Sequence, residues 1–212
     1  IRSQGLNKVL NTSNPINLDW NLNTYRNEKS ISYENRYTEI YYQYDEKVDY
    51  AGLGKQEDET LQKVAFIAYK QHFFSSILLL QSPIDNVKLS STDLINDEKI
   101  DTVFTKSFKS TLPLAFKNGE LNHNLNWYFG PTDYASLKAY NKDIEKIVPL
   151  GWGIFGWINK FIFIPLFGFL SSYIAYGIAI IIFTILIKIA MSPITYQSFL
   201  SQAKMKVLRP EI

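Results

Sequence analysis

Three glycines in the segment Gly151-Trp152-Gly153-Ile154-Phe155-Gly156 have the spacing of the dinucleotide-binding pattern GxGxxG. In that pattern the glycines follow a β-strand and let the backbone approach a pyrophosphate at the start of a helix. Here no strand-like segment precedes them, Trp152 and Phe155 would crowd the phosphates, and no acidic residue follows about 20 residues later. Glycines interleaved with aromatic rings instead favour a helix at a membrane interface. We therefore expect no cofactor at this segment.

The chain also offers few residues for nucleophilic or metal chemistry, since it has two histidines and no cysteine. His72 lies near Ser75 and Ser76, but no GxSxG pattern is present. Neither His72 nor His123 has metal-ligand spacing with carboxylates. The acidic run Glu57-Asp58-Glu59 is interpreted as a solvated loop. We expect ordinary strand histidines, no metal site and no catalytic site.

Lys188 is the charge that interrupts the most apolar part of the chain. A lysine at the centre of a membrane helix costs about 2.5–3.5 kcal/mol on insertion scales, and less near an end, where its stem can reach the interface. Two interpretations stay open: an end marker of the helix, or a charge that faces a polar cavity in a helical bundle. Ile189-Ala190-Met191 continues the apolar run beyond the charge, which counts against the end marker.

Residues 151–191 form that apolar run, and Lys160 and Lys188 are its only charges. A single helix of this length would measure roughly 60 Å, about twice the hydrocarbon core of a bilayer. Pro165 and the pair Ser171-Ser172 divide it. The sequence predicts an amphipathic interfacial helix at 149–172 and one transmembrane helix at 173–191.

Residues 1–148 show the alternation of apolar and polar residues that is typical of strands with one buried face. It is clearest at 16–22 and 40–44, and Asn118-Gly119 predicts a type I′ turn between strands of a hairpin. Further short strands are expected at 64–69, 77–80, 87–89 and 103–108. We predict a mainly β fold, an antiparallel sandwich, followed by α-helical membrane segments.

Helical spacing replaces this alternation after residue 131. A connecting helix is expected from Asp133 to Ile147, with Thr132 as its cap and Pro149 and Gly151 at its end. Its apolar positions at helical spacing are Leu137, Tyr140, Ile144 and Ile147. After Met191, Ser192-Pro193 is expected to open a new helix, the start of a helical hairpin at 192–212. The sequence of this last segment carries Lys204, Lys206 and Arg209 with only Glu211 opposing them, which favours a cytoplasmic side for 192–212 and a location outside the cytoplasm for residues 1–150.

The overall charge gives no support for nucleic-acid binding. The formal net charge is +2, and no run of Lys and Arg interleaved with aromatic rings is present. The chain starts with Ile1 and has no charged segment before an apolar core near its start, so we expect a fragment of a longer protein.

Several motifs occur in a fixed order along the chain: Asn126-Trp127-Tyr128-Phe129-Gly130-Pro131, Gly151-Trp152-Gly153, the span at 180–188, Met191-Ser192-Pro193-Ile194-Thr195 and the end of the chain at 203–212, with Lys70-Gln71-His72-Phe73-Phe74 earlier. In this order they resemble the bacterial YidC branch of the YidC/Oxa/Alb family of membrane protein insertases. The resemblance is specific from about residue 126 onward and looser before it.

The resemblance implies a periplasmic β-supersandwich, an interfacial helix seated by Phe155, Trp157 and Phe161, and then the first of five core membrane helices. It also implies that Lys188 occupies the position of a basic residue, usually arginine, that projects into a hydrophilic groove. Lysine keeps the charge but lacks the planar fork of arginine for paired hydrogen bonds.

The expected function is therefore insertion and folding of inner-membrane proteins, without enzymatic chemistry or cofactors. The partners that the resemblance implies are nascent membrane proteins, the Sec translocon, the ribosome and the lipid bilayer. One alternative is a membrane-tethered periplasmic sandwich that binds a glycan or peptide. A third class, a sugar-processing enzyme on a sandwich scaffold, is weaker because a fold alone supplies no chemistry.

Overall fold

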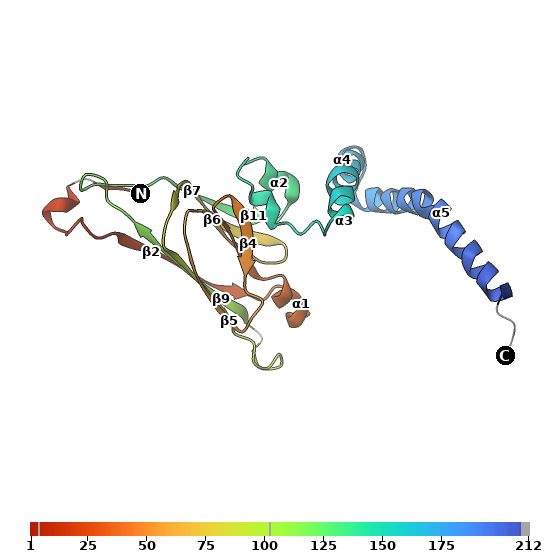
Figure 1. Cartoon of the computed structure of the whole chain (residues 1–212), viewed down its shortest axis with the longest axis horizontal. Helices are drawn as coiled ribbons and strands as arrows, with labels where there is room; N and C mark the ends of the chain where they lie inside the picture. Colours follow the sequence, from red (N-terminus) through yellow and green to blue (C-terminus); the bar gives the residue numbers. More distant parts are fainter. Residues whose placement is uncertain (4, 102, 209–212) are drawn as a thin grey trace. The chain divides into compact units, whose positions relative to one another are not determined.

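The computed structural model describes residues 1–3, 5–101 and 103–208 of the chain, with the backbone alone at 7 and 206–208. These residues form two compact units, Ile1–Val148 and Pro149–Ile212. The first unit consists mainly of strands, with short helical segments that include α1 (Ile31–Arg36), and the second consists of helices (Figure 1). Each unit is described by itself.

Two antiparallel sheets make up the first unit, as predicted, and a two-stranded ribbon completes it. The four-stranded sheet has the order β2 (Ile16–Tyr25), β9 (Phe104–Leu114), β8 (Val87–Asp93) and β5 (Gln56–Leu61). The five-stranded sheet has the order β11 (Leu125–Pro131), β7 (Phe74–Ile84), β6 (Val64–Lys70), β3 (Glu39–Tyr44) and β4 (Lys47–Ala51). The ribbon pairs β1 (Arg2–Ser3) with β10 (Leu121–Asn122).

The main core lies between the two sheets because alternate side chains of both sheets point inward. From β3 it receives Ile40 and Tyr42, while Tyr41 points to the other face. From β9 it receives Phe108 and Leu112, which are fully buried. The predicted alternation of β2 is confirmed, with Leu18, Trp20 and Leu22 packed against this core.

A second core covers the outer face of the five-stranded sheet. Tyr41, Phe66 and Ile77 from the sheet pack there against two short helical segments, α2 (Tyr134–Lys138) and the 3₁₀ turn η2 (Ile144–Ile147). Because both faces of this sheet are covered, nearly every residue of β6 and of the middle of β7 is buried. This explains their nearly continuous apolar sequence.

The predicted helix from Asp133 to Ile147 is wrong as a single helix. Asp133, not Thr132, caps α2 by accepting a 2.8 Å hydrogen bond from the Ser136 N–H. The helix then ends, and Asn141 and Asp143 have left-handed backbones, with φ of 51° and 60°. Of the four positions at helical spacing, Leu137, Ile144 and Ile147 are buried and Tyr140 is exposed, and the spacing did not indicate the interruption.

The turn at Asn118-Gly119 forms as predicted, but the hairpin around it does not. Asn118 and Gly119 have φ of 53° and 77°, and Lys117 and Glu120 exchange backbone hydrogen bonds. Beyond that bridge the chain separates: β9 stays in the four-stranded sheet and β11 joins β7 in the other. Alternation specifies which face of a strand is buried, not which strand lies beside it.

The acidic run at 57–59 lies in β5 rather than in a loop. β5 is the edge strand of the four-stranded sheet, where charged side chains protect against pairing with other chains. Glu57 accepts hydrogen bonds from the N–H groups of Gly52, at 2.6 Å, and Gly54. Because this edge strand carries charged side chains, it lacks the apolar alternation that is typical of the other strands.

The second unit contains a short helix α3 (Ile154–Ile158), a π-helical turn η3 (Asn159–Phe163), then α4 (Ile164–Tyr173) and α5 (Tyr176–Leu208). The predicted start of a new helix at Ser192-Pro193 is wrong, since α5 continues through Pro193. Proline removes one backbone donor and bends a helix without having to end it. In Figure 1, α5 bends along its length.

Candidate functional site

The glycines of the segment 151–156 serve a tight turn that opens α3. Gly151 and Gly153 have φ of 96° and 59°, and a β-carbon on Gly156 would lie 2.5 Å from the carbonyl oxygen of Gly151. The Asn159 side chain closes the turn by donating a 2.6 Å hydrogen bond to the Leu150 carbonyl. The glycines thus allow the backbone to approach itself, a sufficient reason for their spacing.

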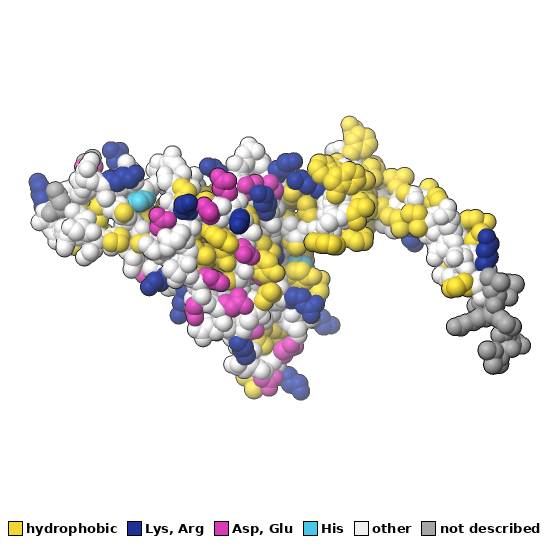
Figure 2. All heavy atoms as spheres, viewed as in Figure 1, with side chains coloured by type: hydrophobic (Ala, Val, Ile, Leu, Met, Phe, Trp, Pro, Cys, Tyr) yellow, Lys and Arg dark blue, Asp and Glu magenta, His cyan; other side chains and the backbone are white. Residues whose placement is uncertain are grey.

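Two apolar stretches in this unit are long enough to cross a membrane, by length and composition: Ile154–Tyr173, with 20 residues, and Tyr176–Met205, with 30. Almost none of their side chains is buried, and hydrophobic atoms cover much of the visible face of these helices (Figure 2). Exposed apolar surface of this extent marks a membrane or protein contact. The second stretch includes Lys188.

Aromatic rings join α4 to the start of α5. The ring of Phe183 lies 5.6 Å from those of both Phe163 and Phe167, in edge-to-face geometry. Phe167 also meets Tyr176 at 5.1 Å, and Ala179 is fully buried beside them. The first two turns of α5 therefore pack against α4, while the part that carries Lys188 extends beyond these ring contacts.

The three predicted interfacial anchors are all exposed, with 69% of Phe155, 56% of Trp157 and 57% of Phe161 accessible. The structure brings Trp157 and Phe161 together, with ring centroids 5.7 Å apart. The Lys160 ammonium lies 5.7 Å from the centre of the Phe161 ring. Phe155 lies in the first turn of α3. Rings beside a cation are suited to the headgroup region of a bilayer.

Lys188 is exposed on α5 and makes no salt bridge within the part of the chain that the structure describes. Its neighbours along the helix form a polar stripe that the sequence analysis missed. Thr184 and Ser192 lie one turn before and after it, and Thr195 and Gln202 follow at seven-residue intervals. The helical spacing of these polar residues could have indicated the stripe. The predicted break at residue 192 placed them in two separate helices, so the spacing was not recognised.

The hydroxyl groups of this stripe are partly satisfied within the helix. Thr184 donates a 2.8 Å hydrogen bond to the Ile180 carbonyl, and Thr195 donates a 3.0 Å bond to Met191. Such bonds let threonine lie in an apolar setting at low cost. Lys188 is thus the member of the stripe that carries a full charge.

In the sandwich, the two histidines lie apart, and the prediction that they are strand residues is wrong: His72 lies between β6 and β7, and His123 lies between β10 and β11. His72 Nδ1 lies 2.5 Å from Glu28 Oε1 and the ring stacks on Tyr37, a pairing that the sequence analysis did not find. The nearby Ser75 hydroxyl pairs with Thr132 at 2.6 Å instead. Among the described residues no group of three His, Cys, Asp or Glu side chains is arranged to hold a metal ion.

Two buried lysines hold the sandwich together. Lys70 Nζ lies 2.9 Å from Glu39 Oε2, and Lys106 Nζ donates to the carbonyl oxygens of Asn35, Thr38 and Gly52. Burial lowers the pKa of Lys106 below its usual value. Because these ammonium groups bind backbone carbonyl groups and a carboxylate inside the domain, we assign a structural role to both lysines.

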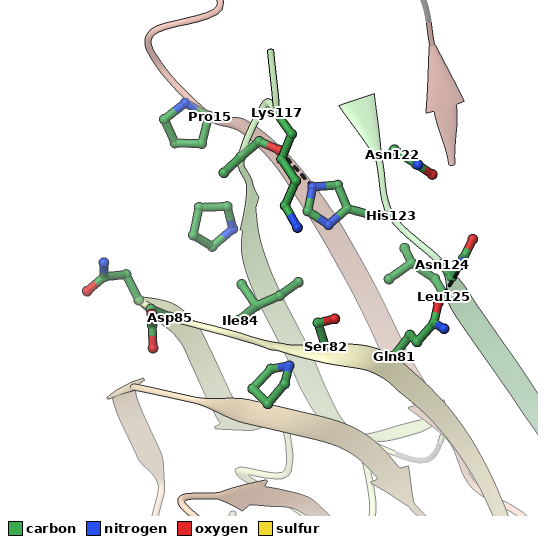
Figure 3. A pocket seen from close by; sticks show the side chains of 14 residues that line it. Pro15, Gln81, Ser82, Ile84, Asp85, Lys117, Asn122, His123, Asn124 and Leu125 are labelled. Atoms are coloured by element: carbon green, nitrogen blue, oxygen red, sulfur yellow. Dashed lines mark hydrogen bonds between the residues drawn. The ribbon is translucent and has the colours of Figure 1, made fainter. Parts of the chain in front are cut away.

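The sandwich also contains a pocket of about 580 Å³ at the ends of β7 and β9 (Figure 3). His123, Lys117 and Ser82 lie around it, together with three proline rings. His123 Nε2 is 2.8 Å from the Ala115 carbonyl oxygen. The sequence analysis treated His123 as an ordinary strand residue.

A β-sandwich followed by exposed apolar helices defines a membrane protein with a large domain outside the bilayer. Comparison with family models agrees: residues 7–165 match the YidC periplasmic domain and residues 162–212 match the 60Kd inner membrane protein. The chain belongs to the YidC family of inner-membrane proteins. The predicted family and the predicted fold are both confirmed.

Curated relatives cover the whole chain. A protein of Parabacteroides distasonis is 37% identical over 225 residues, which include 100% of this chain and 35% of the relative. Proteins of Azobacteroides pseudotrichonymphae and Porphyromonas gingivalis are 36% and 35% identical, over 93% and 92% of this chain and 34% and 32% of their own lengths. All three are named membrane protein insertase YidC. The chain spans about a third of the length of these relatives.

Proposed function

We propose that this chain is part of an insertase that moves segments of other membrane proteins into the inner membrane, and that α5 lines the route. The observation that carries the proposal is the polar stripe of α5, with Lys188 among Thr184, Ser192 and Thr195 on a helix that is otherwise apolar along 176–191. An intramembrane charge in such a position marks a functional site by default.

The physical task is to lower the barrier for polar groups that cross hydrocarbon. An unpaired polar group costs roughly 2–7 kcal/mol in an apolar medium, and a charge costs more. A stripe of hydroxyl groups and one ammonium replaces part of the lost hydration. The apolar faces on either side let the incoming transmembrane segment move sideways into lipid. This work requires neither a cofactor nor a catalytic residue.

The proposed orientation places the sandwich in the periplasm and the end of α5 in the cytoplasm. Lys204, Lys206 and Arg209 support it, because positive residues that flank a membrane helix favour the cytoplasmic side. The transmembrane part is then 173–191, and 192–212 begins a cytoplasmic hairpin. That segment is available to nascent membrane proteins, to the ribosome and to the Sec translocon, which we propose as partners.

We further propose that 149–172 lies along the periplasmic surface of the bilayer, although its length would also permit a span. Trp157, Phe161 and Lys160 support the interfacial location, since ring and ammonium groups favour headgroups. With Phe155 they would seat the helix. α5 would then be the first helix of the membrane core.

Photo-crosslinking tests the proposed role of α5. A photoreactive amino acid replaces Lys188 or Thr195 in the full-length protein, and ribosome-bound nascent membrane proteins are offered in inverted membrane vesicles. We expect adducts at both positions and few at Leu186, which lies on the opposite side of the helix. Equal yields at Leu186 and Lys188, or none at Lys188 and Thr195, would remove the stripe from the route.

A second candidate function is a membrane-tethered sandwich that binds a ligand in the periplasm. The pocket beside His123 is the observation that favours it. The two candidates differ in the effect of deleting residues 1–148 from the full-length protein. Retained insertion by the truncated protein favours the insertase, with α5 as its route. If neither the full-length nor the truncated protein supports insertion, the tethered sandwich is favoured.

A further inference from the structure

We propose that the pocket beside His123 binds a neutral pyranose sugar. This inference rests on the second candidate function, a sandwich that binds a ligand, and does not depend on the insertase function. Its cavity of about 580 Å³ lies within the range of roughly 300–1,000 Å³ that is usual for small-molecule sites. The polar groups that project into it, and the rings that wall it, select the class of ligand.

His123 presents a ring nitrogen to the pocket. Its Nε2 lies 2.8 Å from the Ala115 carbonyl oxygen, which can only accept, so Nε2 carries a proton. Nδ1 is the ring nitrogen that remains available to a ligand. Figure 3 shows Nδ1 directed into the pocket, on the side of Ser82.

Lys117 presents donors to the same space. Lys117 lines the same pocket as His123, its ammonium group points toward the pocket in Figure 3, and it has no salt bridge within the described part of the chain. A ligand must therefore accept from Lys117 and form a hydrogen bond with Nδ1 of His123. A hydroxyl group can do both because it donates and accepts, and a sugar ring carries several such groups.

An anion fits less well. A phosphate or carboxylate would accept from Lys117, but the acidic side chain of Asp85 also lines the pocket and opposes a second negative charge there. Ser82 can donate or accept, which suits a hydroxyl group again. The donors and acceptors together favour a neutral, polyhydroxylated ligand over a charged one.

The walls favour a ring over a peptide. Pro15, Pro83 and Pro113 line the pocket with Ile84. Proline lacks a backbone N–H, so strand ends built from these residues offer few donors to an extended peptide that would pair with the sheet. Their rigid apolar rings instead form surfaces on which the C–H face of a pyranose can lie. Because these rings are already rigid, little conformational freedom is lost on binding.

The two histidines of the chain make the test direct, since His123 reports on the pocket and His72 on a separate part of the sandwich. The full-length protein, labelled with ¹³C-histidine, is placed in phospholipid nanodiscs; maltoside detergents are avoided because their headgroups are sugars. The imidazole signals are followed by NMR while D-glucose, D-galactose or N-acetyl-D-glucosamine is added. Signals of histidines elsewhere in the longer protein are assigned by substitution.

We expect at least one sugar to shift the His123 signal to saturation and leave His72 unchanged. Lys117→Met and Ser82→Ala keep the reporter and should weaken binding at least tenfold, whereas the exposed Lys99→Met should not. An unchanged His72 signal shows that each variant is folded. The proposal is overturned if no sugar shifts His123, if His72 shifts equally, or if trialanine or inorganic phosphate shifts His123 and the sugars do not.

Discussion

Gly156 and Gly151 approach each other so closely that a β-carbon on Gly156 would lie 2.5 Å from the Gly151 carbonyl oxygen. The contact closes the turn that leads into α3, and the Asn159 amide holds the same turn through Leu150. The geometry of the chain just before its first apolar helix thus depends on the absence of one side chain.

Gly156→Ala should open this turn, because backbone atoms must move to admit the methyl group, at a cost of roughly 1–3 kcal/mol. Hydrogen exchange measured in nanodiscs should become faster at amides 151–159. Gly168→Ala is the matched control, since a β-carbon there meets no atom within 4 Å. Equal exchange in Gly156→Ala and the native chain would show that the close contact does not hold the turn.

Glu39 and Lys70 form a buried ion pair whose side chains are 10% and 2% exposed. Lys70→Met should destabilise the sandwich by about 3–5 kcal/mol, because it leaves a carboxylate without its partner in an apolar setting. The double variant with Glu39→Gln should lose less than the sum of the single variants. Denaturant unfolding of the three variants measures the coupling, and additive losses would show that the pair contributes nothing as a pair.

Lys106 should make stability depend on pH. Burial lowers its pKa in the folded state, so the unfolded chain binds more protons at pH values between that pKa and 10.5, its ordinary value. The free energy of unfolding should therefore rise as pH increases through this range. Above about pH 10 it should fall, since the buried Tyr41, Tyr42 and Tyr69 have raised pKa values and ionise more readily when unfolded.

Comparison of variants isolates the lysine. Lys106→Met should lose the rise below pH 10.5 while keeping the fall caused by the tyrosines. Lys88→Met, which removes an exposed lysine from the neighbouring β8, should keep both. Unfolding by urea at a series of pH values checks this. A rise of the same slope in Lys106→Met would assign it to another group.

The sequence predicted the sandwich well because alternation reports directly on which side chains are buried, as in β2 and β3. The prediction failed where different backbone conformations would bury the same residues. Leu137, Ile144 and Ile147 are buried, but Tyr140 of the same predicted face is exposed, and the left-handed Asn141 and Asp143 divide the predicted helix. Likewise, the turn at Asn118-Gly119 was predictable from two residues, whereas the sheet that β11 joins depends on distant β7.

The candidate site was only partly predictable for a related reason. The charge of Lys188 stands out in an apolar run, but the polar stripe is apparent only once α5 is seen to continue through Pro193. The His72–Glu28 pair joins residues far apart in sequence, and no local pattern indicates it. Proline and histidine near a pocket carry no distinctive spacing either, so the cavity beside His123 required the fold.

The location of 149–172 can be tested with single cysteines, because this chain contains none of its own. Cysteine is introduced at Trp152 or at Tyr173 in the full-length protein after any other cysteines have been replaced. If the segment lies along the periplasmic surface, both positions should react with a membrane-impermeant maleimide added to spheroplasts. If Ile154–Tyr173 crosses the membrane, the two positions lie on opposite sides and only one reacts.

The charge of Lys188 gives the sharpest test of the proposed route. Lys188→Arg keeps the positive charge and should retain insertion, whereas Lys188→Glu should reduce insertion of substrates whose translocated tails are acidic, because like charges repel in a medium of low dielectric constant. Insertion is measured by protease protection in cells that depend on the variant. Leu186→Gln, across the helix, controls for a polar change outside the stripe. Insertion by Lys188→Glu equal to that of the native protein would exclude the charge from the mechanism and leave α5 with only its apolar faces.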